Sequence, residues 1–174
     1  MTLVELLCAA YVSLLLPNAD IACENMETIV EVSDQYSVDP AVMVSLIYVE
    51  SRWKPSAVSS AGACGLTQIL PKYSAGTFGR FGRKLNCRQL MNPTTNITRG
   101  TKILGYFLQR YDENYRRSLC TYNAGWSRCK RSRRAHKGHR YAKKVIKLAR
   151  RIDREMKEIQ IEYENEVAPP GCYE

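Results

Sequence analysis

Apolar side chains recur every three or four residues along most of this chain, which is the spacing that places them on one face of an α-helix. The pattern predicts helices over residues 24–36, 40–50, 92–111, 117–123 and 141–161. No stretch of useful length alternates apolar and polar residues in the way that a half-buried β-strand does. The sequence therefore predicts an all-α fold, in which any β-structure is minor.

Two of these helices have clear start signals. Asp39-Pro40 and Asn92-Pro93 each combine a capping side chain with a proline at the first helical position. The segments 51–65, 78–89 and 127–140 are rich in Gly, Ser, Lys or Arg, and we interpret them as loops. Glu50 is then expected at the C-terminal end of a largely buried helix, directly before the first of these loops.

The length of the chain predicts one domain with flanking segments. With 174 residues and 45% hydrophobic side chains, the chain can bury one substantial core. Residues 1–23 are an apolar segment, interpreted either as a helix docked on the domain or as a signal or anchor, and too short for a comfortable membrane span. The domain itself is assigned to residues 24–161, and residues 162–174 are interpreted as a loose acidic tail.

Charge is strongly segregated along the sequence. Residues 1–50 contain eight carboxylates and no Lys or Arg, whereas the rest of the chain holds all 26 Lys and Arg, so that the net charge is +9. A basic body attracts anionic partners such as a cell-wall polymer, a membrane surface or a nucleic acid. The basic loop 128–140 is the segment expected to contact an anionic envelope polymer.

The cysteines leave their pairing open. Seven are present, none in a CxxC pair, and the chain has two histidines, so we expect neither a metal site nor a cofactor. Disulfides are expected if the protein works in an oxidising compartment. Cys120 alternatively fits a small buried side chain on a helix.

Glu50 is followed by an acid-free stretch that constrains the chemistry. From Ser51 to Tyr111 the chain has no Asp or Glu, although it carries ten Lys and Arg. A glycosidase normally needs two carboxylates, one as the acid and one as the nucleophile or base. A single carboxylate beside a substrate-binding loop favours a reaction in which the substrate supplies the second group, and this points to peptidoglycan.

Four landmarks in the sequence resemble the soluble lytic transglycosylase domain family. They occur in order, as Glu50-Ser51, a loop containing Gly62-Ala63, Gly65-Leu66 and Gln68-Ile69, then Asn92-Pro93 with Asn96-Ile97 and Gly100, and finally Tyr122-Asn123-Ala124-Gly125 before Tyr141. The resemblance covers roughly residues 25–155 and departs from the usual pattern at Thr67, where Met is common. It implies a lysozyme-like fold.

The resemblance also implies a reaction and a site. Glu50 is expected to protonate the oxygen between N-acetylmuramic acid and N-acetylglucosamine, and then to deprotonate the C6 hydroxyl so that a 1,6-anhydro ring closes without water. Its pKa should be raised by apolar surroundings. The residues expected to bind the glycan strand or to orient Glu50 are Ser59, Gln68, Tyr122, Asn123 and Tyr141.

Three alternatives stay open at this point. A hydrolytic muramidase of the same fold would need a second acid, for which the candidates are Asp112, Glu113, Asp34 and Asp39, although Asp39 is better explained as a cap. A nucleic-acid-binding protein would use the basic run 128–151 and would need no Glu50, which disfavours it. The third is a catalytically inactive subunit of a virion or secretion assembly.

The expected location is the periplasm and cell envelope, or a phage virion acting on the host envelope.

Overall fold

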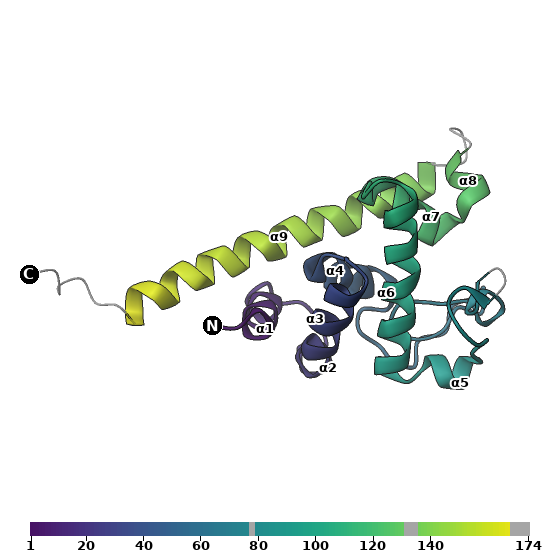
Figure 1. The fold of residues 1–174 in the computed structure, drawn as a ribbon. Helices are drawn as coiled ribbons and strands as arrows, with labels where there is room; N and C mark the ends of the chain where they lie inside the picture. Colours follow the sequence, from purple (N-terminus) through teal and green to yellow (C-terminus); the bar gives the residue numbers. More distant parts are fainter. Residues whose placement is uncertain (77–78, 131–135, 168–174) are drawn as a thin grey trace, which may run out of the picture.

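The computed structural model describes residues 1–76, 79–130 and 136–167, and in this part of the chain the secondary structure is helical. The elements are α1 (Leu3–Ser13), α2 (Ala19–Glu24), α3 (Met26–Gln35), α4 (Pro40–Ser51), the 3-10 turn η1 (Pro71–Tyr73), α5 (Cys87–Leu90), α6 (Pro93–Arg110), α7 (Tyr115–Ala124), α8 (Trp126–Lys130) and α9 (His136–Val167) (Figure 1). The β-structure in the described residues consists of isolated bridges that join Cys64 to Val58 and to Ile69. The predicted all-α class is confirmed.

Helix α4 lies at the centre of the core and carries Glu50 in its last turn. The predicted cap is present, because Asp39 Oδ1 accepts a hydrogen bond from the Ala41 amide at 2.8 Å and Pro40 follows it. Almost every side chain from residue 41 to residue 47 is buried, in contact with helices α3 and α9. The helix ends at Ser51, and the capping residue Arg52 has a φ of 51°. Glu50 is thus fixed by the packing of the helix that carries it.

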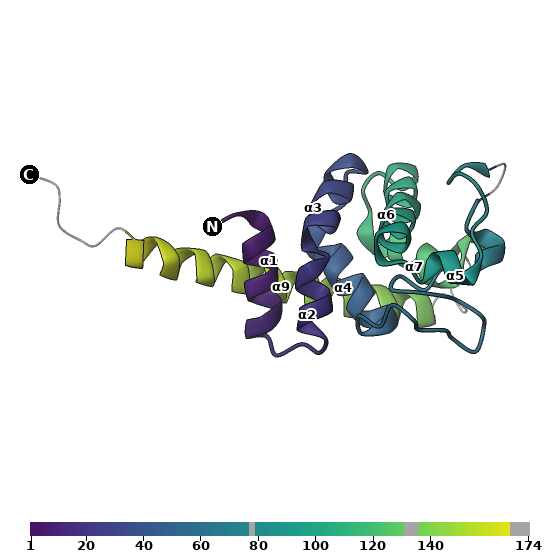
Figure 2. The same ribbon diagram turned by 90° about the horizontal axis from the view of Figure 1, so that it is seen from below.

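Helix α9 is long and runs along one side of the molecule (Figure 1). It packs against α7, α4 and α1 in turn, and its C-terminal end projects past α1 (Figures 1 and 2). Its buried stripe contains Tyr141, Ala142, Val145, Ala149 and Ile152. Helix α9 thereby packs both against α1 near the N-terminus and against α7 beside the cleft.

The predicted ends of this last helix, 141 and 161, are both wrong. The helix begins at His136 and ends at Val167, and the predicted loop 127–140 contains α8 as well. Lys and Arg are good helix formers, so a segment without apolar residues can still be helical when its neighbours hold it. At Gly138 the helix approaches α7 so closely that a Cβ would lie 2.6 Å from Cys120 Sγ. Residues 131–135 of the predicted loop and 168–174 of the predicted tail lie outside the described residues.

The N-terminal segment is packed on the rest of the molecule. Helix α1 lies against α9 and buries Leu7, Ala10 and Tyr11, and a disulfide joins Cys8 to Cys23 on α2. The Tyr11 ring meets the fully buried Trp53 edge to face, with 5.9 Å between the ring centroids. Among the described helices, none has both the length and the apolar character that a membrane crossing requires.

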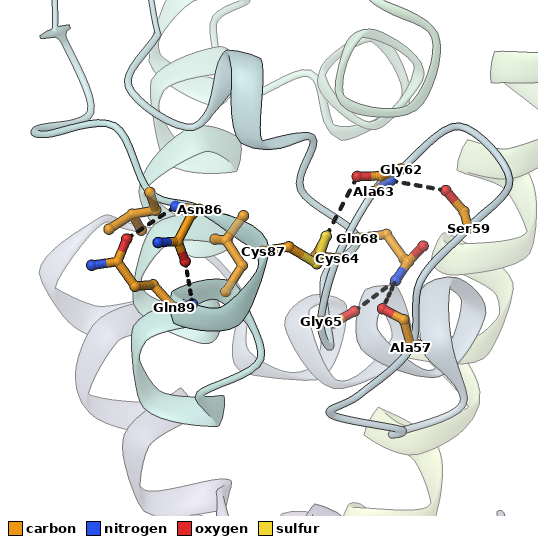
Figure 3. The surroundings of a disulfide bond; sticks show 12 residues. Ala57, Ser59, Gly62, Ala63, Cys64, Gly65, Gln68, Asn86, Cys87 and Gln89 are labelled. Atoms are coloured by element: carbon orange, nitrogen blue, oxygen red, sulfur yellow. Dashed lines mark hydrogen bonds between the residues drawn. A yellow bond between two sulfur atoms is a disulfide. The ribbon is translucent and has the colours of Figure 1, made fainter.

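Two further disulfides hold the part of the molecule that follows α4. Cys64 in the loop after α4 is bonded to Cys87 at the start of α5 (Figure 3), and Cys120 on α7 is bonded to Cys129 on α8. Cys120 is therefore a disulfide partner rather than a free buried thiol. Cys172 lies outside the described residues. The bond from Cys64 to Cys87 lies in a small apolar cluster with Ile69, Leu85 and Leu90.

The loop between α4 and η1 is fixed by one buried amide on α6. The Asn96 side chain is fully buried; its Nδ2 donates to the carbonyl oxygens of Leu90 at 2.7 Å and Cys64 at 3.0 Å. Its Oδ1 accepts from the amide of Thr67 at 2.7 Å and from the Thr67 hydroxyl at 2.6 Å. A Cβ on Gly65 would lie 2.0 Å from the Leu90 carbonyl oxygen, so only glycine permits this approach. Asn96 thus replaces the hydrogen bonds that a β-sheet would have supplied to this loop.

We expect Asn96→Ala to lower the free energy of unfolding by roughly 3 kcal/mol or more, because several buried polar groups lose their partners at once. The matched control is Asn92→Ala on the same helix, which removes the cap bond from Asn92 Oδ1 to the Thr95 amide and should cost about 1 kcal/mol. Denaturant unfolding of both variants measures the difference. Equal losses would contradict a special role for the buried amide.

Candidate active site

Glu50 lines a cleft with a volume of about 930 Å³. One wall comes from the loop after α4, with Ser59 and Gln68, and the other from α6, with Tyr106 and Phe107. The N-terminal part of α8 and the end of α7 close one side of the cleft. Its volume lies at the upper end of the range for ligand-binding clefts.

The pKa of the Glu50 carboxyl group lies well above its ordinary value. Burial raises its pKa from the ordinary 4.5 to about 7, because an apolar environment disfavours the charged form. A hydrogen bond with Tyr141 acts in the opposite direction and lowers the pKa. Burial outweighs it, so a large part of the population is protonated at neutral pH. A proton donor and a base are therefore available from one group.

Tyr141 lies behind Glu50 rather than in the cleft. It is 8% exposed, and its buried hydroxyl lies close enough to the Glu50 carboxyl to lower the pKa of that group, although the two do not meet the geometry of a regular hydrogen bond. Burial raises the pKa of the Tyr141 phenol well above 10, and the Glu50 charge raises it further. Tyr141 thus stays a neutral hydroxyl that can donate to the carboxylate. The stripe of α9 that fixes this ring is the one that packs against α4.

Ser59 and Gln68 use part of their hydrogen-bonding capacity to shape the loop. Ser59 Oγ accepts from the Ala63 amide at 3.0 Å, and Gln68 Nε2 donates to the carbonyl oxygens of Ala57 at 3.1 Å and Gly65 at 2.9 Å (Figure 3). Both residues line the cleft. What they still offer to a ligand is the Ser59 hydroxyl proton and Gln68 Oε1.

Tyr122 and Asn123 follow each other on α7 and differ in their role. Tyr122 donates its hydroxyl to the Thr67 carbonyl oxygen at 2.9 Å, so it ties α7 to the same loop that Asn96 holds. Asn123 is exposed at the edge of the cleft. The structure therefore brings Glu50, Ser59, Gln68, Tyr122 and Asn123 to one cleft, with Tyr141 beneath it.

Glu50 is the one carboxylate among the described residues that line the cleft. The candidates for a second acid lie elsewhere. Asp39 caps α4, Asp34 is in the last turn of α3, and Asp112 and Glu113 form the turn after α6, where both have a positive φ. Nor does the described part of the chain bring three His, Cys, Asp or Glu side chains together as a metal site would need.

Sequence reasoning missed most of the cleft wall opposite the loop. Ile103 and Phe107 are apolar residues of α6, and both line the cleft together with Tyr106 and Arg110 of the same helix. Arg80 and Phe81 come from a segment interpreted as a surface loop, and Arg80 stacks over the Tyr106 ring at 4.7 Å. The sequence feature that could have revealed this wall is the apolar stripe of α6, which is wider than packing against the core alone requires.

Comparison with known proteins gives a family match. The family model described as the transglycosylase SLT domain matches residues 27–145. The membrane-bound lytic murein transglycosylase C of Glaesserella parasuis is 38% identical over 87 residues, which are 48% of this chain and 24% of that protein. The soluble lytic murein transglycosylase of Escherichia coli K12 is 40% identical over 78 residues, 44% of this chain and 12% of that protein. This chain spans about a quarter or less of the length of these two relatives.

A phage protein and solved structures are also similar. The transglycosylase of Enterobacteria phage PRD1 is 31% identical over 99 residues, which are 57% of this chain and 34% of that protein. The crystal structure of the 70 kDa soluble lytic transglycosylase of Escherichia coli has a TM-score of 0.67 at 24% identity and covers 75% of this chain and 24% of its own. An inactive mutant of the Pseudomonas aeruginosa enzyme has a TM-score of 0.66 at 22% identity, with 75% and 24% covered.

The structural likenesses show the fold, which is all-α and lysozyme-like as expected. The family match spans α3 to the first turns of α9, so it contains all six residues of the predicted site. The chain belongs to the transglycosylase SLT domain family.

Proposed function

We propose that this chain is a peptidoglycan lytic transglycosylase that cleaves the bond between N-acetylmuramic acid and N-acetylglucosamine, with Glu50 as acid and then as base. The observation that carries the proposal is a single carboxyl group in a large cleft, with its pKa raised to about 7. Relatives named lytic murein transglycosylases support the substrate.

The chemistry balances with one catalytic group. Glu50 donates its proton to the glycosidic oxygen, and the bond from C1 of N-acetylmuramic acid to that oxygen breaks. The N-acetyl oxygen of the same sugar stabilises the cationic C1. The Glu50 carboxylate then takes the proton of the C6 hydroxyl, and O6 forms a bond to C1. Each turnover returns Glu50 to its protonated form without consuming water.

The other cleft residues fit an uncharged sugar. Gln68 Oε1 and the Ser59 hydroxyl can bind N-acetyl and hydroxyl groups without burying a charge. Asn123 offers a side-chain amide from another edge of the cleft. Tyr141 is a positioning residue, since it acts through the orientation of Glu50. Tyr122 supports the loop through Thr67.

Cationic and aromatic side chains from η1, from the segment between η1 and α5, and from α6 also line the cleft. Lys72, Arg80 and Arg110 line the cleft beside Tyr73 and Tyr106. Aromatic rings stack on sugar faces, and the cations suit the carboxylates of the peptides that peptidoglycan carries. The cleft therefore complements both components of peptidoglycan.

The setting we propose is a cell envelope. Three disulfides among the described residues are typical of proteins that work outside a reducing cytosol. The similar proteins include membrane-bound and soluble murein transglycosylases and a phage transglycosylase, so an envelope enzyme and a virion enzyme both fit. Contact of the basic segment 128–140 with an anionic envelope polymer, and assembly with a virion or secretion machine, remain predictions.

A hydrolytic muramidase of the same fold is less well supported. Hydrolysis would need a second carboxylate to activate water, and the described cleft lining contains Glu50 alone. The two reactions differ in their products, so they can be separated by experiment.

We expect mass spectrometry of fragments released from purified peptidoglycan to show anhydro-muramic ends, each lighter by one water than a reducing end. Glu50→Gln should reduce release on the order of 10³-fold, because it removes the proton that the leaving oxygen receives. Glu31→Gln, the same change at an exposed site on α3, should leave release unchanged. Reducing ends that depend on Glu50 would make the protein a hydrolase.

We expect Glu50→Gln to stabilise the fold increasingly as pH rises. The folded pKa of about 7 lies above the ordinary 4.5, so wild-type stability falls between these two pH values, where the folded state holds a proton that the unfolded state has lost. The glutamine variant lacks this dependence. Its advantage over wild type should grow from pH 5 to pH 8 by up to about 3 kcal/mol, as measured by denaturant unfolding. Glu31→Gln should show a flat difference, and a flat difference for Glu50→Gln would contradict the raised pKa.

A further inference from the structure

The cleft has a half-exposed tryptophan at its rim. Trp126 is the first residue of α8, lines the cleft together with Asn123, and is 49% exposed. Tryptophan has the largest aromatic side chain, and covering it with a partner removes a large apolar area from water. The exposed half of this ring is therefore apolar surface that a ligand in the cleft can cover.

The local structure holds Trp126 in this position. Gly125 follows the last residue of α7 with a φ of 81°, a conformation that favours glycine, and the chain turns there into α8 (Figure 1). The Gly125 carbonyl oxygen accepts hydrogen bonds from the amides of Arg128 and Cys129, both at 3.2 Å. The disulfide from Cys129 to Cys120 ties α8 back to α7. A ring fixed in this way loses little further freedom when it binds a ligand, which favours affinity.

Trp126 lies nearer to the solvent than Glu50 does. The Glu50 carboxyl is largely buried, whereas Trp126 and Asn123 are exposed. The glycosidic oxygen that receives a proton from Glu50 must reach the deeper carboxyl group, while the rest of a long strand continues along the rim. Trp126 is therefore placed to face a sugar that flanks the cleaved bond.

The chemistry of an indole ring fits such a sugar. A β-1,4-linked N-acetylhexosamine carries its hydroxyl and N-acetyl groups around the edge of its ring, so that both faces present C–H groups. Stacking these C–H groups on an aromatic face removes apolar surface of both partners from water. Asn123, three residues before Trp126, supplies an amide for the polar groups at the edge of the sugar.

We propose that Trp126 is a specificity-determining residue, which stacks on a sugar flanking the cleaved bond and gives the chain a preference for long glycan strands over short fragments. This role rests on the proposed function, because it requires a glycan strand in the cleft. A disaccharide bound at Glu50 gains little from Trp126, whereas a longer strand contacts both residues. Loss of the indole should therefore weaken the binding of strands more than it slows the chemical step.

Intrinsic fluorescence tests this contact, because the two tryptophans of the chain differ in exposure. Trp53 is fully buried with its ring against Tyr11, and only Trp126 lines the described part of the cleft. The titration uses Glu50→Gln, which prevents cleavage, and glycan strands freed of their peptides by an amidase. We expect the emission to shift to shorter wavelength as strands bind. The shift should be absent from the Trp126→Phe variant in the same background.

Calorimetry of the same variants measures how much the ring contributes to affinity. Trp126→Ala should raise the dissociation constant for strands about tenfold, with a smaller rise in Trp126→Phe and little change for the disaccharide. Tyr163→Ala, which removes an exposed aromatic ring of α9 outside the cleft, should leave all these constants unchanged. Circular dichroism checks that each variant is folded. In the active chain, Trp126→Ala should raise KM for fragment release more than it lowers kcat.

Two results would overturn the role of Trp126 and leave the proposed function standing. They are strand binding without a change in emission, and an equal dissociation constant for strands in Trp126→Ala, since the release of anhydro ends that depends on Glu50 is measured separately. Strands that fail to bind even with Trp126 present would overturn both proposals.

Discussion

The buried amide of Asn96 is the interaction on which the site depends. It binds the backbone of the loop after α4 at Cys64 and Thr67, and the end of α5 at Leu90, from one position on α6. Tyr122 adds a bond to Thr67 from α7, and the disulfide from Cys64 to Cys87 closes the other side. A segment without a sheet is thereby made rigid enough to form one wall of the cleft, with Gln68 in a positive-φ conformation.

The acidity of Glu50 follows from the way in which its helix is buried. Helix α4 is buried on nearly all sides, and α9 packs against it with Tyr141, so the carboxyl group lies in a mainly apolar surrounding that also contains the phenols of Tyr141 and Tyr122. The same burial that raises the pKa also costs stability at high pH, because the charged form is poorly solvated. Function and stability are therefore opposed at this residue, which is common at catalytic sites.

The sequence predicts the parts of this architecture that depend on neighbouring residues. Asp39-Pro40 and Asn92-Pro93 mark two helix starts correctly, and the spacing of apolar residues identifies α4 and the buried stripe of α9. The polar network could not be predicted, because Asn96 meets partners about 30 residues earlier in the sequence. Its position as a family landmark was visible, but its structural role was not. The same reason applies to disulfide pairing and to the α6 wall of the cleft, whose aromatic residues look like core in sequence.

A direct titration of Glu50 tests the central claim most clearly. Carbon NMR of the side-chain carboxyl, assigned by its loss in Glu50→Gln, should give a midpoint near pH 7. In Tyr141→Phe the midpoint should move higher, because the hydrogen bond that lowers the pKa is gone. A midpoint near the ordinary value of 4.5 would mean that Glu50 is charged at neutral pH, and the account of one group acting as both acid and base would be wrong.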